Sequence, residues 1–186
     1  MDVMNFLVSS VIITALGCIF HFTYDWSGKK KWVGIFSAVN ESTWEHIKIG
    51  LTGALLYAIV DGIMVGGNGN FLIGKAAELL IIIFAMPTMY YIIDAILRRL
   101  VLVVDILEFV ATIFLSRLVF YQFLAMPKVG GIWEIVAGVA IGIVVLCYVT
   151  FTFFPPKNFL FVDTRNGKYG FSASQTRARK RKKRRK

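Results

Sequence analysis

Charged residues are scarce in this chain. Only 17% of its 186 residues are charged and 57% are hydrophobic, whereas soluble domains carry about 25% charged residues. Acids are scarcest, with eleven Asp and Glu against twenty-one Lys and Arg, which leaves a net charge of +10. Nine of the basic residues are confined to positions 177–186. The composition therefore excludes an ordinary soluble domain and disfavours nucleic acid as a partner.

Several sequence signatures are also missing. The two cysteines, Cys18 and Cys147, lie inside apolar runs without CxxC spacing, so no disulfide framework is indicated. Residues 1–22 lack a positive n-region and a small-residue cleavage site, which argues against a cleavable signal peptide. Only two histidines occur, and no HExxH or other specific catalytic motif is present. The sequence therefore leans against an enzyme and identifies no cofactor through a specific motif.

Long apolar runs are abundant. A helix of about 20 residues spans roughly 30 Å, the thickness of the hydrocarbon core of a bilayer. Backbone groups in hydrocarbon must be satisfied within the segment, so each run should be helical. We expect an all-α polytopic membrane protein whose first 156 residues form a bundle of five transmembrane helices, at about 3–22, 47–65, 75–96, 101–124 and 132–154.

The C-terminal part differs in character. Pro155 and Pro156 end the last helix. Asn166-Gly167 between aromatic-rich flanks predicts a short hairpin within residues 157–172. Residues 173–186 are expected to form a disordered basic tail, and its cluster from Arg177 to Lys186 predicts contact with anionic lipids.

Basic residues also predict the orientation. With the N-terminus outside and the C-terminus in the cytoplasm, nine basic residues before the tail lie on the cytoplasmic side. Only Lys75, Arg117 and Lys128 fall in the outer half. This imbalance follows the positive-inside rule.

Small residues predict close helix packing on two runs. Gly138 and Gly142 form a GxxxG pattern in the fifth run. The second run carries a small residue at every fourth position, namely Gly50, Ala54, Ala58, Gly62 and Gly66. Such stripes let helix backbones approach each other, either within the bundle or across a homodimer.

Acids inside the predicted spans are candidates for function, because charge within a bilayer is costly. The predicted orientation sorts them into two layers. In the outer layer, Asp61, Glu78 and Glu134 accompany Arg117, and an ion pair is expected there. In the cytoplasmic layer we expect a polar site built from His21, Asp25, Glu41, Glu45, His46, Asp94, Asp105 and Glu108.

Residues 39–48 hold three members of this polar site. Ser42 and Glu45 fit a capping box, in which the serine hydroxyl and the glutamate satisfy each other's backbone amides. Helix capping alone could explain this stretch. Two functional interpretations stand beside it. His21, Asp25 and His46 are weak candidates for binding a divalent transition metal, and Asp105 and Glu108 are candidate relay groups on a proton or ion path.

The sequence therefore favours a small transporter or an ion- or proton-conducting protein with its polar site at the cytoplasmic leaflet. The first alternative is a membrane-embedded, metal-dependent enzyme. The second is a non-catalytic accessory or scaffold protein that binds partners through its small-residue stripes and basic tail.

Four motifs carry a resemblance to a known family. They are Tyr24-x-Trp26-Ser27-Gly28, Val39-Asn40-Glu41-Ser42-x-Trp44-Glu45-His46-x-Lys48, Phe151-Thr152-Phe153-x-Pro155-Pro156 and Gly167-x-Tyr169-Gly170. With these motifs the chain resembles an uncharacterised bacterial membrane-protein family, domain of unknown function 6512, over roughly residues 10–170. The resemblance implies a multi-span helical fold in a bacterial cytoplasmic membrane. It implies no activity, because the family has none assigned.

Overall fold

The structure, a computed structural model, describes residues 3–97 and 102–174. In chain order its elements are α1 (Val3–Trp26), the 3-10 helix η1 (Val33–Ile35), α2 (Thr43–Val65), α3 (Phe71–Leu97), α4 (Leu102–Ala125) and α5 (Ile132–Phe153). No strand occurs in these described ranges. The predicted all-α class is confirmed.

The prediction of five membrane-spanning helices needs a correction. Four helices, α1, α2, α3 and α5, are long and apolar enough to cross a membrane. The fifth predicted span is a helix, α4, but it is not among these candidates. It carries Asp105, Glu108 and Arg117, and such charges lower the apolar character of a segment. The four apolar helices suggest a membrane-embedded protein.

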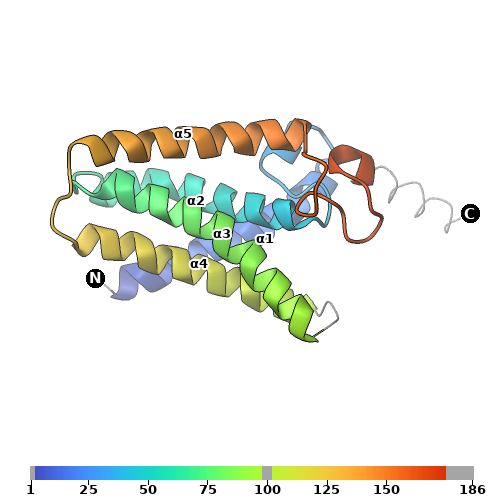
Figure 1. The fold of residues 1–186 in the computed structure, drawn as a ribbon, viewed down its shortest axis with the longest axis horizontal. Helices are drawn as coiled ribbons and strands as arrows, with labels where there is room; N and C mark the ends of the chain where they lie inside the picture. The colour runs from blue at the N-terminus through green and yellow to red at the C-terminus, as the bar shows by residue number, and fades with distance from the viewer. Residues whose placement is uncertain (1–2, 98–101, 175–186) are drawn as a thin grey trace, which may run out of the picture.

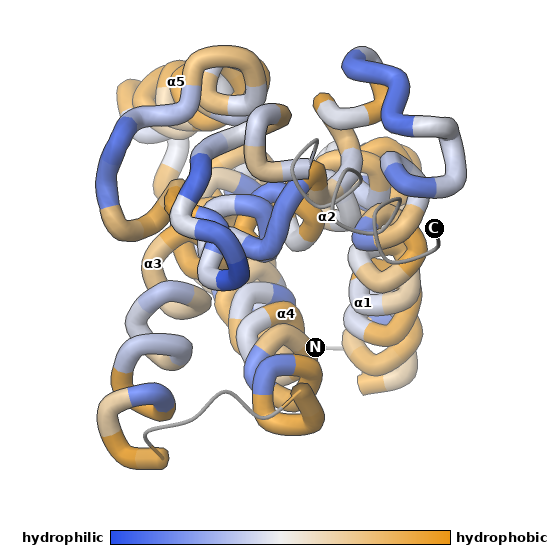
Figure 2. Tube along the Cα trace, turned by 90° about the vertical axis from the view of Figure 1, so that its right-hand side faces the viewer, coloured by the Kyte–Doolittle hydropathy of each residue, from blue (hydrophilic) through white to orange (hydrophobic). Residues whose placement is uncertain are grey.

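The helices form a bundle in which consecutive elements run in opposite directions (Figure 1). α1 packs against α2 and α4, and α3 packs against α2, α4 and α5. The segment between α1 and α2 and the segment after α5 gather at one end, seen on the right of Figure 1. We call this the polar end and define it as residues 27–42 and 155–174. Figure 2 looks onto it and shows hydrophilic segments in front of largely hydrophobic helices.

The core lies where four helices meet. Ile13 of α1, Leu51 of α2, Leu79 and Ile82 of α3 and Ile113 of α4 are each fully buried. Outside this core, large apolar side chains point outward, such as Ile63 on α2 at 83% exposed. A soluble protein rarely exposes contiguous apolar surface on this scale, so the outward faces agree with a lipid environment.

The predicted small-residue stripes pack at some positions only. At Gly50 an added Cβ would lie 3.1 Å from Ile82 of α3, so this glycine permits the α2–α3 contact. At Gly62, Gly138 and Gly142 an added Cβ would meet nothing within 4 Å. The prediction that Gly138 and Gly142 pack within the bundle is therefore wrong for the described residues, and their role in a homodimer stays a prediction.

Gly53 of α2 lies directly against the backbone of α1. A Cβ there would lie 2.7 Å from the backbone oxygen of Ile13, which cannot move without displacing α1. We expect Gly53→Ala to cost about 1–3 kcal/mol of stability through overpacking. Gly62→Ala is the matched control, since it adds the same atom in open space and improves helix propensity. Thermal unfolding in detergent checks this; equal melting temperatures for the two variants would contradict it.

The C-terminal segment is more irregular than predicted. Around Gly167, whose φ is 66°, the chain makes a turn closed by one antiparallel bridge between Val162 and Tyr169. One bridge is not a strand pair, so the expected hairpin is present only as a turn. The predicted basic cluster at 177–186 lies outside the described residues.

Candidate metal centre at the polar end

Backbone hydrogen bonds hold the polar end in place. The amide of Ala38 donates to the carbonyl of Phe20 on α1 at 3.2 Å. The amide of Trp44 at the start of α2 donates to the carbonyl of Leu160 at 2.8 Å. The loop before α2 is therefore fixed to α1, and the segment after α5 is fixed to α2.

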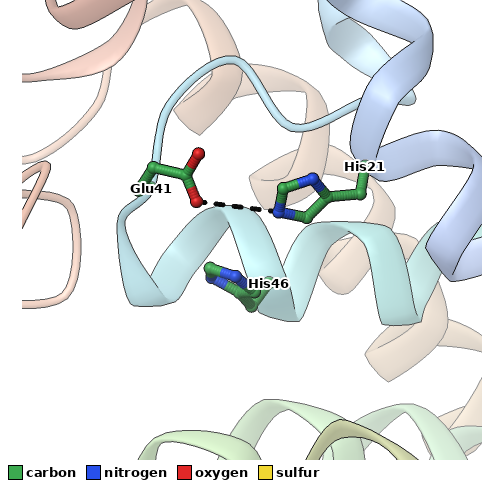
Figure 3. Close-up of side chains that lie close together, drawn as sticks. All are labelled: His21, Glu41 and His46. Atoms are coloured by element: carbon green, nitrogen blue, oxygen red, sulfur yellow. Dashed lines mark ion pairs between the residues drawn. The ribbon is translucent and has the colours of Figure 1, made fainter. Parts of the chain in front are cut away.

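His21, Glu41 and His46 converge at this end. They come from the last turns of α1, the loop before α2 and the first turn of α2 (Figure 3). His21 Nε2 lies 3.7 Å from Glu41 Oε2, and the two imidazole centroids are 5.5 Å apart. One ligand atom from each of the three residues lies within 4.8 Å of the others, and all three side chains are half-buried. We call these residues the His-Glu-His cluster.

One nitrogen of the His46 imidazole is held by a backbone carbonyl. Its Nδ1 lies 3.0 Å from the backbone carbonyl of Ser42. A carbonyl can only accept, so Nδ1 carries the proton and Nε2 keeps its lone pair. A backbone carbonyl that fixes the histidine tautomer in this way is a usual outer partner of metal-binding histidines.

The spacing of the cluster is close to that of a zinc site. Two ligands bonded at 2.0–2.1 Å in tetrahedral geometry lie about 3.3 Å apart. The His21–Glu41 distance of 3.7 Å is near this value. Separations of up to 4.8 Å elsewhere in the cluster have to shorten when an ion binds, which side-chain rotation can supply.

Two residues of the C-terminal segment hold Glu41 in place. Arg165 Nη1 lies 3.0 Å from Glu41 Oε1, and the Thr164 hydroxyl donates to the Glu41 carbonyl at 3.2 Å. Burial alone would raise the pKa of Glu41, but the hydrogen bond and charge of His21, then the charges of Arg165 and His46, lower the pKa to about 2. The carboxylate is therefore ionised at neutral pH, as a metal ligand must be.

This lowered pKa predicts a pH-dependent effect of Glu41→Gln. Because the folded-state pKa lies below the ordinary value of 4.5, ionised Glu41 stabilises the fold above about pH 4.5, and this stabilisation disappears as the pH falls toward 2. We expect the metal-free variant to be less stable than the wild type by up to about 3 kcal/mol near pH 5, where Glu41 is ionised and protonated imidazoles face it. The difference from the wild type should narrow between pH 4.5 and 2 in unfolding measurements. A difference that stays constant across that window would contradict the assignment.

The structure places two other candidates outside the cluster. The Asp25 side chain is 59% exposed and pairs with Lys29 at 3.6 Å. Glu45 is buried and turns to Lys48 Nζ, 2.6 Å away, and to the amide of Val39, 2.9 Å away. Asp25 and Glu45 therefore serve local ion pairs.

The predicted capping box is wrong in its contacts. Ser42 is the N-cap residue of α2, but its hydroxyl makes no capping hydrogen bond. Glu45 reaches back to Val39 instead of Ser42. The Ser42 amide donates to the side chain of Asn40 at 2.8 Å. The loop before α2 is thus closed by Asn40 and Glu45.

The predicted site also included three acids on α3 and α4, and they differ in their relation to the cluster. Asp94 is exposed near the end of α3. Asp105 on α4 interacts electrostatically with His46. Glu108 is buried further along α4. Of these three acids, Asp105 is the one that interacts with a residue of the His-Glu-His cluster.

A small cavity of about 60 Å³ lies beside the cluster. His21 and Glu41 contribute to its wall, and His46 does not. The remaining wall comes from both parts of the polar end and from the last turns of α1. Its other lining residues are Phe22, Asp25, Lys29, Ala38, Val39, Asn40, Asp163 and Ser174.

At the opposite end, the predicted ion pair is part of a larger buried cluster. Arg117 Nη1 and Nη2 lie 2.8 and 3.0 Å from the two carboxylate oxygens of Asp61, and Arg117 also pairs with Glu78 at 3.3 Å. Lys75 contacts both acids and completes the cluster. Lys75 was missed as a member, although its i,i+3 spacing to Glu78 is the signal that could have identified it.

Glu134 is the outer-layer acid that does not join Arg117. It forms an exposed pair with Lys128 at 3.6 Å, where the two side chains are 37% and 69% exposed. It lies in the first turn of α5. Arg117 therefore pairs with Asp61 and Glu78, and Glu134 pairs elsewhere.

One of three comparisons with known proteins identifies the family of the chain. No curated protein and no solved structure matches it. The family model described as "Family of unknown function (DUF6512)" matches residues 3–171. That match contains the helices α1 to α5 and all three residues of the His-Glu-His cluster. The chain therefore belongs to the DUF6512 family of unknown function.

Proposed function

We propose that this is a multi-pass membrane protein that binds a divalent transition metal through His21, Glu41 and His46. The observation that carries the proposal is the convergence of two imidazoles and an ionised carboxylate, with ligand atoms within 4.8 Å of one another. Zinc accepts this donor set, and two histidines with one glutamate are one of the ligand sets of catalytic zinc sites. Iron and manganese are the alternatives with related ligands.

Within this proposal the bundle lies in a bacterial cytoplasmic membrane. The excess of basic residues favours a cytoplasmic polar end, an outside N-terminus and a basic tail against anionic lipids. α4 crosses with the other helices, because its three charged residues are at least partly covered by neighbouring helices; Arg117 and Glu108 are 0% and 6% exposed. Charges inside a membrane are accommodated when they face the bundle interior.

A metal-dependent enzyme explains the described geometry better than a transporter. The cavity adjoins two of the three proposed ligands. At the far end, Asp61, Glu78, Lys75 and Arg117 are engaged with one another. These four side chains satisfy one another, so they do not provide a binding site for a passing cation.

Metal analysis of the purified protein tests this proposal. After loading with zinc and removal of excess ion, we expect about one zinc per chain, since binding at a dedicated site is stoichiometric. Zinc should be lost on treatment with a chelator and restored on reloading. A protein that retains no transition metal at micromolar free zinc would contradict the proposal.

A proton or ion path along α4 is the second candidate function. Glu108, Thr112 and Ser116 lie one turn apart and are all buried, at 6%, 0% and 0% exposed. Such a row of polar groups is a feature of proton paths in membrane proteins. If the protein conducts protons, Asp105→Asn combined with Glu108→Gln should abolish flux in reconstituted vesicles. Unchanged flux in this double variant would contradict the path.

A further inference from the structure

We infer that the metal held by the His-Glu-His cluster keeps one coordination position open toward the adjoining cavity, where it takes an exchangeable small oxygen ligand. The ligand class is water or hydroxide, or a small monoanionic oxygen donor such as a carboxylate. This inference rests on the proposed metal site and adds that the site is of the open, catalytic type.

The number of ligands is the first argument. Among the described residues, the group that could hold a metal ion consists of three side chains, His21, Glu41 and His46. Zinc in proteins is usually four-coordinate, and structural sites fill all four positions with protein ligands. The carboxylates nearby in sequence are engaged elsewhere, Asp25 with Lys29 and Glu45 with Lys48. Three protein ligands therefore leave a fourth position for an outside ligand.

The position of the cavity is the second argument. His21 and Glu41 line it, and His46 does not. In a tetrahedral site the open position points away from all three protein ligands. Because His21 and Glu41 border the cavity, a ligand in the cavity can reach the fourth coordination position of the ion. The cavity volume of about 60 Å³ is enough for water or a small group.

The charges around the cavity are the third argument. Two neutral imidazoles and one carboxylate leave a divalent ion with one uncompensated positive charge, which a hydroxide or a carboxylate neutralises. Asp25 is paired with Lys29, and Asp163 accepts a hydrogen bond from the Arg165 amide at 2.8 Å. Asp25 and Asp163 therefore have partners of their own, so the uncompensated charge in this region is that of the bound ion.

Cobalt substitution tests the inference, because the visible absorption of Co²⁺ reports its ligands. The Co²⁺-loaded full-length protein is titrated with sodium acetate. We expect a saturable change in the absorption bands with the cobalt content unchanged. In Ala38→Leu, whose larger side chain fills part of the cavity wall, cobalt should bind with the same stoichiometry while the acetate response is lost. Ala111→Leu, which adds the same volume on an exposed face of α4, should respond as the wild type does.

The possible failures are distinguishable. A wild-type protein that binds one Co²⁺ but shows no response to acetate overturns the open position and leaves the metal site standing. An acetate response that persists in Ala38→Leu also overturns it, since acetate then reaches the ion elsewhere. A protein that binds no Co²⁺ overturns the proposed function and the inference together. If Ala38→Leu does not fold, Ser174→Val narrows the same cavity and replaces it in the test.

Discussion

Replacing His46 with alanine should abolish metal binding. The change removes one of three ligands, and its tautomer is already fixed by the Ser42 carbonyl at 3.0 Å. Loss of an outer partner of a ligand alone costs about 10–100-fold in affinity, so loss of the ligand itself should cost more than about 100-fold. Competition with a chromophoric chelator measures this loss. His21→Ala should behave in the same way.

Asp25→Asn is the control for this effect. Asp25 was a candidate ligand in the sequence, but its side chain is 59% exposed and pairs with Lys29. We therefore expect the variant to bind zinc with the wild-type stoichiometry and within a few-fold of the wild-type affinity. If Asp25→Asn lost zinc and His46→Ala kept it, the assignment of the cluster would be contradicted.

Removing Arg117 should have the largest effect on stability. Arg117 is fully buried and pairs with Asp61 and Glu78, so Arg117→Met leaves two buried carboxylates to Lys75 alone. Stranding a buried charge typically costs about 3–5 kcal/mol. We expect poor accumulation of the protein, or a melting temperature in detergent well below that of the wild type.

Two further variants distinguish charge from packing in this cluster. Adding Glu78→Gln to Arg117→Met restores the charge balance of the cluster. The double variant should therefore recover part of the stability lost in Arg117→Met, because the effects of mutations at contacting residues are not additive. Glu134→Gln breaks only the exposed pair with Lys128, which is worth roughly 0–1 kcal/mol. If Glu134→Gln lowered the melting temperature as much as Arg117→Met does, burial would not explain the loss of stability.

Much of the fold could be predicted from local sequence. Apolar runs of about 20 residues predicted every long helix, and the errors lie at the ends. α2 begins at Thr43, directly after the predicted cap residue Ser42 and four residues before the predicted membrane span at 47–65. The prediction that α4 is an apolar span was wrong, because its sequence contains charged residues. Two of them, Glu108 and Arg117, are buried within the bundle, and the local sequence does not reveal that burial.

Less of the candidate site could be predicted. His21 and His46 could be named, since histidines are rare in this chain. The choice of Glu41 over Glu45 could not, because it depends on which carboxylate Lys48 and the Val39 amide engage. Arg165 lies more than a hundred positions from Glu41, and nothing in the local sequence relates the two. Contacts of this kind are set by tertiary packing.

X-ray absorption at the zinc edge of the zinc-loaded wild-type protein tests the central claim most directly. The account predicts nitrogen and oxygen ligands at about 2.0–2.1 Å, with the outer-shell scattering of two imidazoles and no sulfur. In His46→Ala, the loss of the scattering from one imidazole would identify His46 as a zinc ligand. Zinc bound by sulfur, or by water oxygens without imidazole, would contradict the account.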